Sequence, residues 1–434
     1  MSDYLQQRAL SVEEAQAIVL KTAKLLDTEV VGIIDAVGRV AACDLISDCD
    51  IAPFDNSAMD GFAVRAADLT DASSENPVAL RVTQEIPAGA VAERPVVAGE
   101  SARIMTGAAM PEGADTVVMY ELVDYGAGDG MQGSTIYFSK PFSLGDNVRR
   151  KGEEVAAGGT VIAQGEVIRA GGVGFMAGCG ITKVEVYRRP VVGLISIGSE
   201  LVPSTGELKA GCIRDSNAYA LAACINQAGG VAKSYGILPD DKDLIIKTVQ
   251  QAIVECDVLI TTGGASNGDY DFIKPVIEEL GSLEISKVAM RPGKAQTFGV
   301  IEGVPVLGLS GNPAAAYVGF ELFARPLLRK MQGYTHLQRL TLKARLASPK
   351  RKSKGRRMYL RGYLSTDESG ELIFTPAKNQ SSGLFNALQQ ANCLAVIDES
   401  IEQNPVEAGT ILSCLMLDIS EDANFLEGSC SNLQ

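Results

Sequence analysis

The chain has 434 residues, enough for about three domains with hydrophobic cores of their own. Its net charge of −14 argues against broad binding to nucleic acid or to an anionic membrane, but allows a small anion in a locally basic pocket. The first residues lack a basic segment followed by an apolar one, and no run of about 18 apolar residues occurs. We therefore expect a cytoplasmic protein that binds neither nucleic acid nor membranes.

Cysteine and histidine usage restricts the possible mechanisms. The nine cysteines form no C-x-x-C pair and most lie in apolar segments, which indicates buried thiols rather than disulfides or zinc ligands. A Ser-His-Asp or Cys-His mechanism would depend entirely on His336, the single histidine. We therefore expect catalysis by Asp, Glu, Lys, Arg, Ser and Thr.

The first half of the chain contains two kinds of sequence pattern. Residues 11–26 carry apolar side chains at helical spacing, with Ser11 as a candidate N-cap. From about 47 to 144, short β-like runs between turn signals predict a small β domain. These runs are 79–82, 102–105, 116–119 and 135–138.

From residue 190, strand-like and helix-like runs alternate. This alternation predicts a mostly parallel, doubly wound sheet that binds ligands at the carboxyl ends of its strands. The predicted strands are 191–197, 232–238, 258–262, 284–290 and 304–309. The predicted helices are 218–227, 244–254, 273–280 and 314–331. After about 334, β-like runs predict a small barrel or sandwich, at 340–346, 357–364, 371–376 and 393–398.

The segment 256–274 is the most informative one. A β-branched strand ends in two glycines, and a small polar loop with two acids leads into a helix pattern. Glycines let the backbone approach a ligand, the helix offers N–H groups to a phosphate, and carboxylates there can hold Mg²⁺. The alternative is a tight turn with Asp271 as an N-cap. The residues concerned are Gly263, Gly264, Ser266, Gly268, Asp269 and Asp271.

Three more loops follow predicted strands or open predicted helices. Glu200 follows one strand, and Pro313 suits the first turn of a helix whose free N–H groups would face an anion. Each loop alone is explained by helix capping, with Asp215 or Ser216 as another natural cap. Four such loops at one sheet edge favour a composite pocket. Its remaining candidate binding residues are Ser310, Gly311 and Asn312.

Basic residues occur near these loops. Lys287, Arg291 and Lys294 could clamp a phosphate or an oxyanion, although most Lys and Arg side chains are simply surface charges. The basic run 350–357 is more typical of a solvated hairpin than of a binding patch.

Six motifs together resemble the molybdopterin molybdenumtransferase family, which includes bacterial MoeA and the E domains of gephyrin and Cnx1. The longest and most specific is Asp-Asn-Ser-Ala-Met-Asp-Gly at 55–61. The others are Arg-Ile-Met-Thr-Gly at 103–107, Asn-Val-Arg-Arg-Lys-Gly-Glu at 147–153, Thr-Thr-Gly-Gly at 261–264, Pro-Gly-Lys at 292–294 and Gly-Asn-Pro at 311–313.

The resemblance implies a homodimer that uses Mg²⁺ to convert adenylylated molybdopterin and molybdate into molybdenum cofactor and AMP. Its pocket would combine the α/β domain of one subunit with the 55–60 loop of the other. Molybdopterin adenylyltransferase and apo-molybdoenzymes are natural partners. The implied parts are a discontinuous linker domain (1–46 and 145–186), an inserted β domain (47–144), a molybdopterin-binding α/β domain (187–333), a C-terminal β-barrel (334–424) and a tail (425–434).

The resemblance also implies residue roles. The candidate metal ligands are Glu200, Asp240, Asp241 and Asp271, with the choice between Asp240 and Asp241 open. The candidate catalytic residues are Asp55, Asp60, Thr106, Lys287, Arg291, Lys294 and Ser382.

The chain departs from the family pattern at several of these motifs. Ile197 and Ser199 replace a Thr and an Asp, Arg291 a Lys, and Ser310 a Pro. Arginine for lysine keeps the charge but changes the geometry. These changes leave two alternatives open: a non-catalytic scaffold that binds molybdopterin or the finished cofactor, and a homologue that inserts tungstate.

Overall fold

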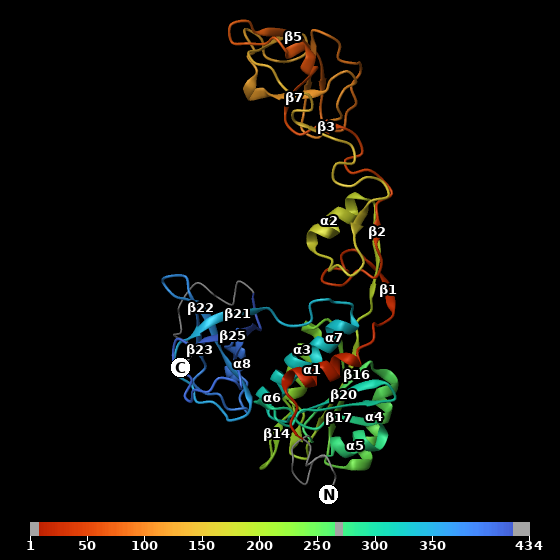
Figure 1. The fold of residues 1–434 in the computed structure, drawn as a ribbon. Helices are drawn as coiled ribbons and strands as arrows, with labels where there is room; N and C mark the ends of the chain where they lie inside the picture. The colour runs from red at the N-terminus through yellow and green to blue at the C-terminus, as the bar shows by residue number, and fades with distance from the viewer. Residues whose placement is uncertain (1–7, 265–271, 420–434) are drawn as a thin grey trace. The chain divides into compact units, whose positions relative to one another are not determined.

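The computed structural model describes residues 8–264 and 272–419 of the chain (Figure 1). Two compact units form: one from the residues up to Glu29 and from Tyr187 onward, the other from Val30–Val186. No helix in these described ranges is long and apolar enough to cross a bilayer.

The Val30–Val186 unit contains a five-stranded sheet in the order β7-β4-β6-β5-β8. Its strands are β4 (Gly61–Val64), β5 (Val78–Ile86), β6 (Glu100–Ile104), β7 (Thr116–Met119) and β8 (Thr135–Phe138), with short 3₁₀ turns at η2 (Ala66–Leu69) and η3 (Tyr120–Leu122). The four predicted runs are confirmed as strands. β4, a buried strand between β7 and β6, was not predicted. A Cβ on its Gly61 would lie 2.1 Å from the carbonyl oxygen of Val118, so only glycine fits there.

The rest of this unit consists of one helix and three short strand pairs. The helix is α2 (Ala170–Gly178). The pairs are β1 (Thr28–Gly32) with β11 (Lys183–Tyr187), β2 (Leu45–Ile46) with β10 (Thr160–Ile162), and β3 (Asn56–Ser57) with β9 (Val148–Arg149).

The other unit is built on a six-stranded sheet in the order β15-β12-β16-β20-β19-β17. Its strands are β12 (Val191–Ile197), β15 (Val231–Leu238), β16 (Val258–Thr262), β17 (Ser282–Ile285), β19 (Thr297–Ile301) and β20 (Val304–Leu309). The first four in sheet order are parallel, whereas β19 and β17 run antiparallel to their neighbours. The prediction missed β19, so the sheet is mixed, with a parallel half that carries the predicted ligand edge.

Helices cover both faces of this sheet (Figure 1). One face packs against α1 (Val12–Lys21), α3 (Asn217–Gln227), α6 (Pro313–Gly319), the π-helical turn η4 (Phe320–Ala324) and α7 (Arg325–Met331). The other face packs against α4 (Lys242–Glu255) and α5 (Ile273–Leu280). The predicted 314–331 helix is therefore interrupted by a π-helical turn. Ser11 caps α1 as expected, and the apolar side of α1 lies in this core, although its residues fall within the predicted linker domain.

The C-terminal segment closes into a β-barrel. Its strands are β21 (Thr341–Leu346), β22 (Arg357–Thr366), β23 (Leu372–Pro376), β24 (Cys393–Ile397) and β25 (Ile411–Met416), with the short helix α8 (Asn386–Gln389). A pairing between β22 and β24 closes the ring. The two-residue strand β18 (Met290–Arg291) joins this barrel by pairing parallel to β22, which contradicts its assignment to the predicted strand 284–290. A further short pair is β13 (Leu201–Val202) with β14 (Ile213–Arg214).

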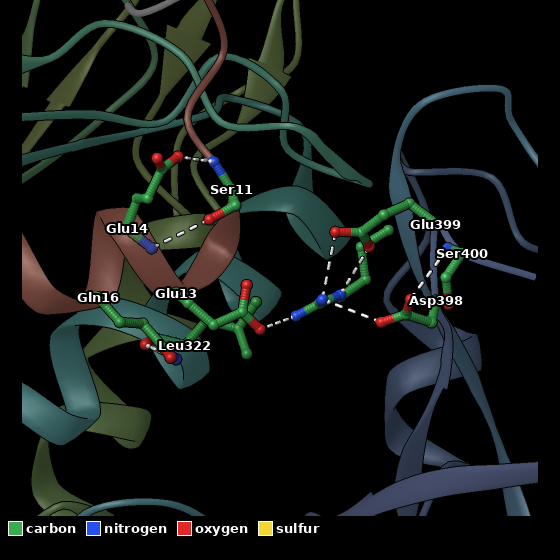
Figure 2. A network of polar contacts seen from close by, with 9 residues as sticks. Ser11, Glu13, Glu14, Gln16, Leu322, Asp398, Glu399 and Ser400 are labelled. Atoms are coloured by element: carbon green, nitrogen blue, oxygen red, sulfur yellow. Dashed lines mark hydrogen bonds and ion pairs between the residues drawn. The ribbon is translucent and has the colours of Figure 1, made fainter.

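Ion pairs join the barrel to the α/β core. Arg357 at the start of β22 contacts Glu13 of α1, Asp398 at 2.9 Å and Glu399 at 2.9 Å, as Figure 2 shows for the carboxylates. Arg339 forms two 2.9 Å hydrogen bonds with the buried carboxylate of Glu321 in η4. Charge-assisted hydrogen bonds therefore link the two parts, one of them through the buried carboxylate of Glu321.

Candidate active site

The glycine turn after β16 has the geometry that the sequence predicts. Gly263 and Gly264 have φ angles of +83° and +63°, in the left-handed region that glycine favours. A Cβ on Gly263 would lie 2.0 Å from the carbonyl oxygen of Ile197 at the end of β12. The ends of the two strands therefore touch, backbone to backbone. Four residues of this prediction lie outside the described residues: Ser266, Gly268, Asp269 and Asp271.

Asn217 joins three of the predicted loops and is a site residue that was not predicted from the sequence. Its side-chain amide donates 2.8 Å hydrogen bonds to the hydroxyl of Thr262 and to the carbonyl oxygen of Gly311. Its own carbonyl oxygen is buried and, in the part of the chain that the structure describes, accepts no hydrogen bond. Its position at the start of a predicted helix could have identified it, but that position was explained by helix capping alone.

Asp215 caps α3, which confirms one of the two caps that the sequence predicted. Its carboxylate accepts a 3.1 Å hydrogen bond from the backbone N–H of Ala218, and the side chain is buried. Ser216 occupies the N-cap position without a capping bond from its side chain. Their proposed contacts with substrate stay predictions.

The prediction that the first N–H groups of α6 are free to bind an anion is wrong. Pro313 does begin the helix, but the N–H of Ala314 donates to the carbonyl oxygen of Ser382 at 2.8 Å. The N–H of Ala315 turns back to the carbonyl of Asn312 at 3.0 Å. The barrel, distant in sequence, therefore caps this helix, and its first N–H groups do not face an anion. The side chain of Ser310 accepts from the N–H of Asn312 at 3.2 Å.

The candidate metal ligands differ in their surroundings. Asp240 accepts hydrogen bonds on Oδ2 from the hydroxyl of Ser199 at 2.9 Å and from its N–H at 3.1 Å. Asp241 caps α4 through the N–H of Leu244 at 3.1 Å. The exposed Glu200 folds back over Gly198. Across residues 8–264 and 272–419, no three His, Cys, Asp or Glu side chains gather closely enough to hold a metal, and Asp271 lies outside these ranges.

A cavity of about 670 Å³ lies beside these acids, between α3 and strands β12 and β15. Its lining combines apolar side chains with the hydroxyls of Ser199 and Tyr219 and the carboxylate of Asp215. Such a mixture of apolar walls and few polar groups is typical of sites for small organic ligands.

A second cavity of about 700 Å³ lies between the α/β core and the barrel. Five basic side chains line it, and among the described residues none of its lining is acidic. Ser310, Asn312, Ser381 and Ser382 add polar groups. The basic residues are Arg291, Lys294, Lys350, Arg351 and Arg356. Three members of the 350–357 run line this cavity while Arg351 stays exposed to solvent, so the choice between a solvated segment and a binding patch stays a prediction. Lys287 is separate, because it lines a cavity of about 230 Å³ with Arg8 and Glu284.

The remaining candidates lie in the Val30–Val186 unit. Asp60 accepts hydrogen bonds from the N–H of Thr106 at 2.7 Å and from its hydroxyl at 2.8 Å, and these bonds lower the pKa of Asp60. Asp55 accepts from the N–H of Lys151 at 2.7 Å and pairs with Arg150 at 2.8 Å, which lowers its pKa. Both acids are therefore held as carboxylates in fixed orientations.

Comparison with known proteins agrees with this architecture. Residues 10–180 match a family described as the MoeA N-terminal region (domain I and II), 193–330 a probable molybdopterin binding domain, and 343–417 the MoeA C-terminal region (domain IV). The molybdopterin molybdenumtransferase of Bacillus subtilis (strain 168) is 37% identical over 389 residues, which cover 89% of this chain and 90% of that protein. That of Staphylococcus aureus (strain MSSA476) is 34% identical over 393 residues, covering 89% and 91%.

A solved structure shows the same fold over almost the whole chain. The molybdopterin biosynthesis MoeA protein of Pyrococcus horikoshii superposes with a TM-score of 0.79 at 33% identity, covering 95% of this chain and 100% of that one. The fold and the matched segments define a protein with a molybdopterin-binding type of α/β domain between MoeA-type flanking domains. The chain belongs to the MoeA family of molybdopterin molybdenumtransferases.

Proposed function

We propose that this protein inserts molybdate into adenylylated molybdopterin and releases AMP, as an active enzyme rather than a scaffold. The observation that carries this proposal is the basic cavity between the α/β core and the barrel. It lies beside the loop that follows β20, whose Gly311 contacts the glycine turn of β16. The carboxyl edge of the parallel strands thus offers a site for an oxyanion next to a site for a nucleotide.

Molybdate would bind in the basic cavity. A tetrahedral dianion is best held by charged donors and hydroxyls, and charge-assisted hydrogen bonds are the strong ones. Arg291, Lys294 and Arg356 supply the charge, and Ser382 supplies a hydroxyl. Tungstate has nearly the same size and charge, so this site would accept it as well.

The pterin nucleotide would bind along the carboxyl edge of β12 and β16. The cavity beside Tyr219 offers apolar walls for a ring system. The turn at Gly263 holds the ends of β12 and β16 together, because no Cβ separates it from the Ile197 carbonyl oxygen. Asn217 fixes the two loops that border this turn through its hydrogen bonds.

Mg²⁺ fits this edge as a shared ion. Proteins often hold Mg²⁺ with one or two carboxylates, while substrate phosphates and water complete its octahedron. Asp240 suits this role because Ser199 orients its Oδ2 and leaves Oδ1 outside those bonds, and Glu200 is the second candidate. Bound there, Mg²⁺ would stabilise negative charge on the phosphates. Asp241 is the weaker candidate because it caps a helix.

The residues present can support the cleavage without histidine. Breaking the pyrophosphate bond places negative charge on the leaving phosphate, and the lysine and arginine side chains of the cavity stabilise it. Water adds to the adenylyl phosphorus as the bond from that phosphorus to the pterin phosphate oxygen breaks, so the pterin phosphate leaves and AMP carries the added oxygen. If a molybdate oxygen adds instead, its Mo–O bond breaks as molybdenum passes to the pterin. We further propose a homodimer in which the carboxylates of Asp55 and Asp60 serve the site of a second copy.

The test is AMP release from adenylylated molybdopterin by the purified protein with Mg²⁺, with and without molybdate. We expect molybdate-dependent release at catalytic rates. Lys294→Ala should weaken molybdate dependence strongly, whereas Lys343→Ala should not, because Lys343 bonds to Ser413 on the barrel surface outside the cavity. Tight binding of the pterin nucleotide without any release would contradict the proposal and favour a scaffold. Parallel assays with tungstate would measure the preference between the two oxyanions.

A further inference from the structure

Arg361 is a fully buried arginine whose charge has no described carboxylate partner. It lies in the middle of β22, and its side chain is among the largest that are completely buried. Its Nη2 donates a 3.2 Å hydrogen bond to the carbonyl oxygen of Ser381. Among the described residues, Nε and Nη1 have no hydrogen-bond partner. Burial lowers the pKa of Arg361 to about 10, which still leaves the guanidinium protonated at neutral pH.

The chain around Arg361 forms one wall of the basic cavity. Ser381, which accepts from the guanidinium, lines that cavity together with Gln380 and Ser382. The side chain of Gln380 pairs with the backbone of Arg361, accepting from its N–H at 3.1 Å and donating to its carbonyl at 2.7 Å. The carbonyl of Ser382 caps α6. Arg361 therefore lies behind this wall, separated from the cavity by the 380–382 segment.

Folding stability does not explain why a charged side chain occupies this buried position. Burying a guanidinium with two nitrogens that have no hydrogen-bond partner among the described residues opposes folding, and a well-packed apolar side chain often serves a buried position better. A positive charge in a medium of low dielectric constant, however, acts strongly on an anion nearby. One peptide segment, which contains Ser381, separates the guanidinium from the cavity. The guanidinium already polarises the carbonyl of Ser381 through its hydrogen bond.

We infer that Arg361 is a positioning residue of the oxyanion pocket: it orients the Ser381–Ser382 wall and adds positive potential from behind it. This inference rests on the proposed function, because it takes the basic cavity as the molybdate site. Arg361 does not touch the anion. Its effect should appear in the affinity for the oxyanion and leave the binding of the pterin nucleotide unchanged.

The test measures molybdate affinity of the full chain by isothermal titration calorimetry. Arg361→Met should weaken molybdate binding by about tenfold or more, because the charge behind the wall is lost. The matched control is Arg345→Met, which removes an exposed arginine of the same barrel that pairs with Glu371 outside the cavity. The control should bind molybdate as the unaltered protein does. Equal affinity of Arg361→Met and the unaltered protein would overturn the inference.

A second variant keeps the test decisive if Arg361→Met does not fold. A lysine buried at the same place loses its proton more readily than arginine as the pH rises. The molybdate affinity of Arg361→Lys relative to the unaltered protein should therefore fall between pH 7 and pH 9. Other groups facing the cavity, Lys294 and Lys350 among them, are common to both proteins and cancel in this ratio. A ratio that is constant with pH would show a merely structural role and overturn the inference.

Failure of the proposed function gives a different result. If Arg291→Ala and Lys294→Ala bind molybdate normally, the cavity is not the oxyanion site and the proposed function loses its support. If both weaken binding while Arg361→Met and Arg361→Lys behave like the unaltered protein, only the inference about Arg361 is overturned. Binding of adenylylated molybdopterin by Arg361→Met should match that of the unaltered protein, and a parallel loss there would overturn the inference, because it would show a general structural role.

Discussion

Replacing Gly263 with alanine should damage both the stability of the α/β sheet and the nucleotide edge. Two costs add at this position. An L-residue at a φ of +83° costs about 1–2 kcal/mol. The new Cβ would also lie 2.0 Å from the Ile197 carbonyl oxygen, so β12 or β16 must shift at its end. Such backbone displacement adds about 1–3 kcal/mol.

Gly303 provides a matched control for the conformational cost alone. It has a φ of +85° in the turn between β19 and β20, and a Cβ there meets nothing within 4 Å. At about 2–4 °C per kcal/mol for a unit of this size, Gly303→Ala should lower the midpoint of the α/β transition by a few degrees. Gly263→Ala should lower it by roughly twice that amount.

Differential scanning calorimetry measures the unfolding temperature of each variant, and titration with adenylylated molybdopterin measures binding at the sheet edge. Gly263→Ala should lose nucleotide binding, because the turn can no longer approach the strand end of β12. Gly303→Ala should keep it. If the two variants unfold at the same temperature and bind the nucleotide equally well, the close packing of the strand ends is not what holds the site.

Further predictions concern single acids. Asp240→Asn should abolish Mg²⁺-dependent AMP release, whereas Asp241→Ala should cost only about 1 kcal/mol of stability as a lost helix cap; the reverse pattern in activity assays would exchange their roles. Glu321→Gln should destabilise the chain by about 3–5 kcal/mol, since it removes the buried carboxylate that pairs with the partly buried Arg339, and a loss below about 1 kcal/mol in calorimetry would contradict this. Asp60 has a folded-state pKa below its ordinary value of 3.8, so its stabilisation is present above pH 3.8 and is lost as the pH falls through the folded pKa. Asp60→Asn should therefore flatten the acid side of the stability profile of its unit, and an unchanged profile between pH 5 and pH 2.5 would contradict this.

The sequence predicted strands well where buried apolar residues dominate a short run. β12, β16 and β20 have the predicted bounds because their burial on both faces requires apolar residues throughout. β4 and β19 were missed for other reasons. β4 has only four residues and begins with glycine, and β19 is joined to β20 by a two-residue turn, outside the alternation of strands and helices on which the prediction rested. Both strands owe their place to neighbours that the local pattern does not reveal.

The candidate site was predictable only within single loops. The glycine turn at Gly263 and the cap at Asp215 depend on nearby residues, and both are confirmed in their geometry. The capping of α6 by Ser382 and the gathering of Arg356 with Arg291 depend on how the barrel meets the α/β core. Spacing along the chain carries no information about such contacts. The roles of these residues in turnover stay predictions.

The two-residue strand β18 makes the barrel inseparable from the domain that precedes it. Met290 and Arg291 follow β17 along the chain, yet they hydrogen-bond in register with Arg357 and Met358 of β22. A fragment that starts at residue 334 would leave this strand behind and expose an unpaired edge of β22, which invites aggregation. Exchange of barrels between relatives, by recombination in evolution or by an engineer, must therefore carry the Met290–Lys294 segment along with the barrel.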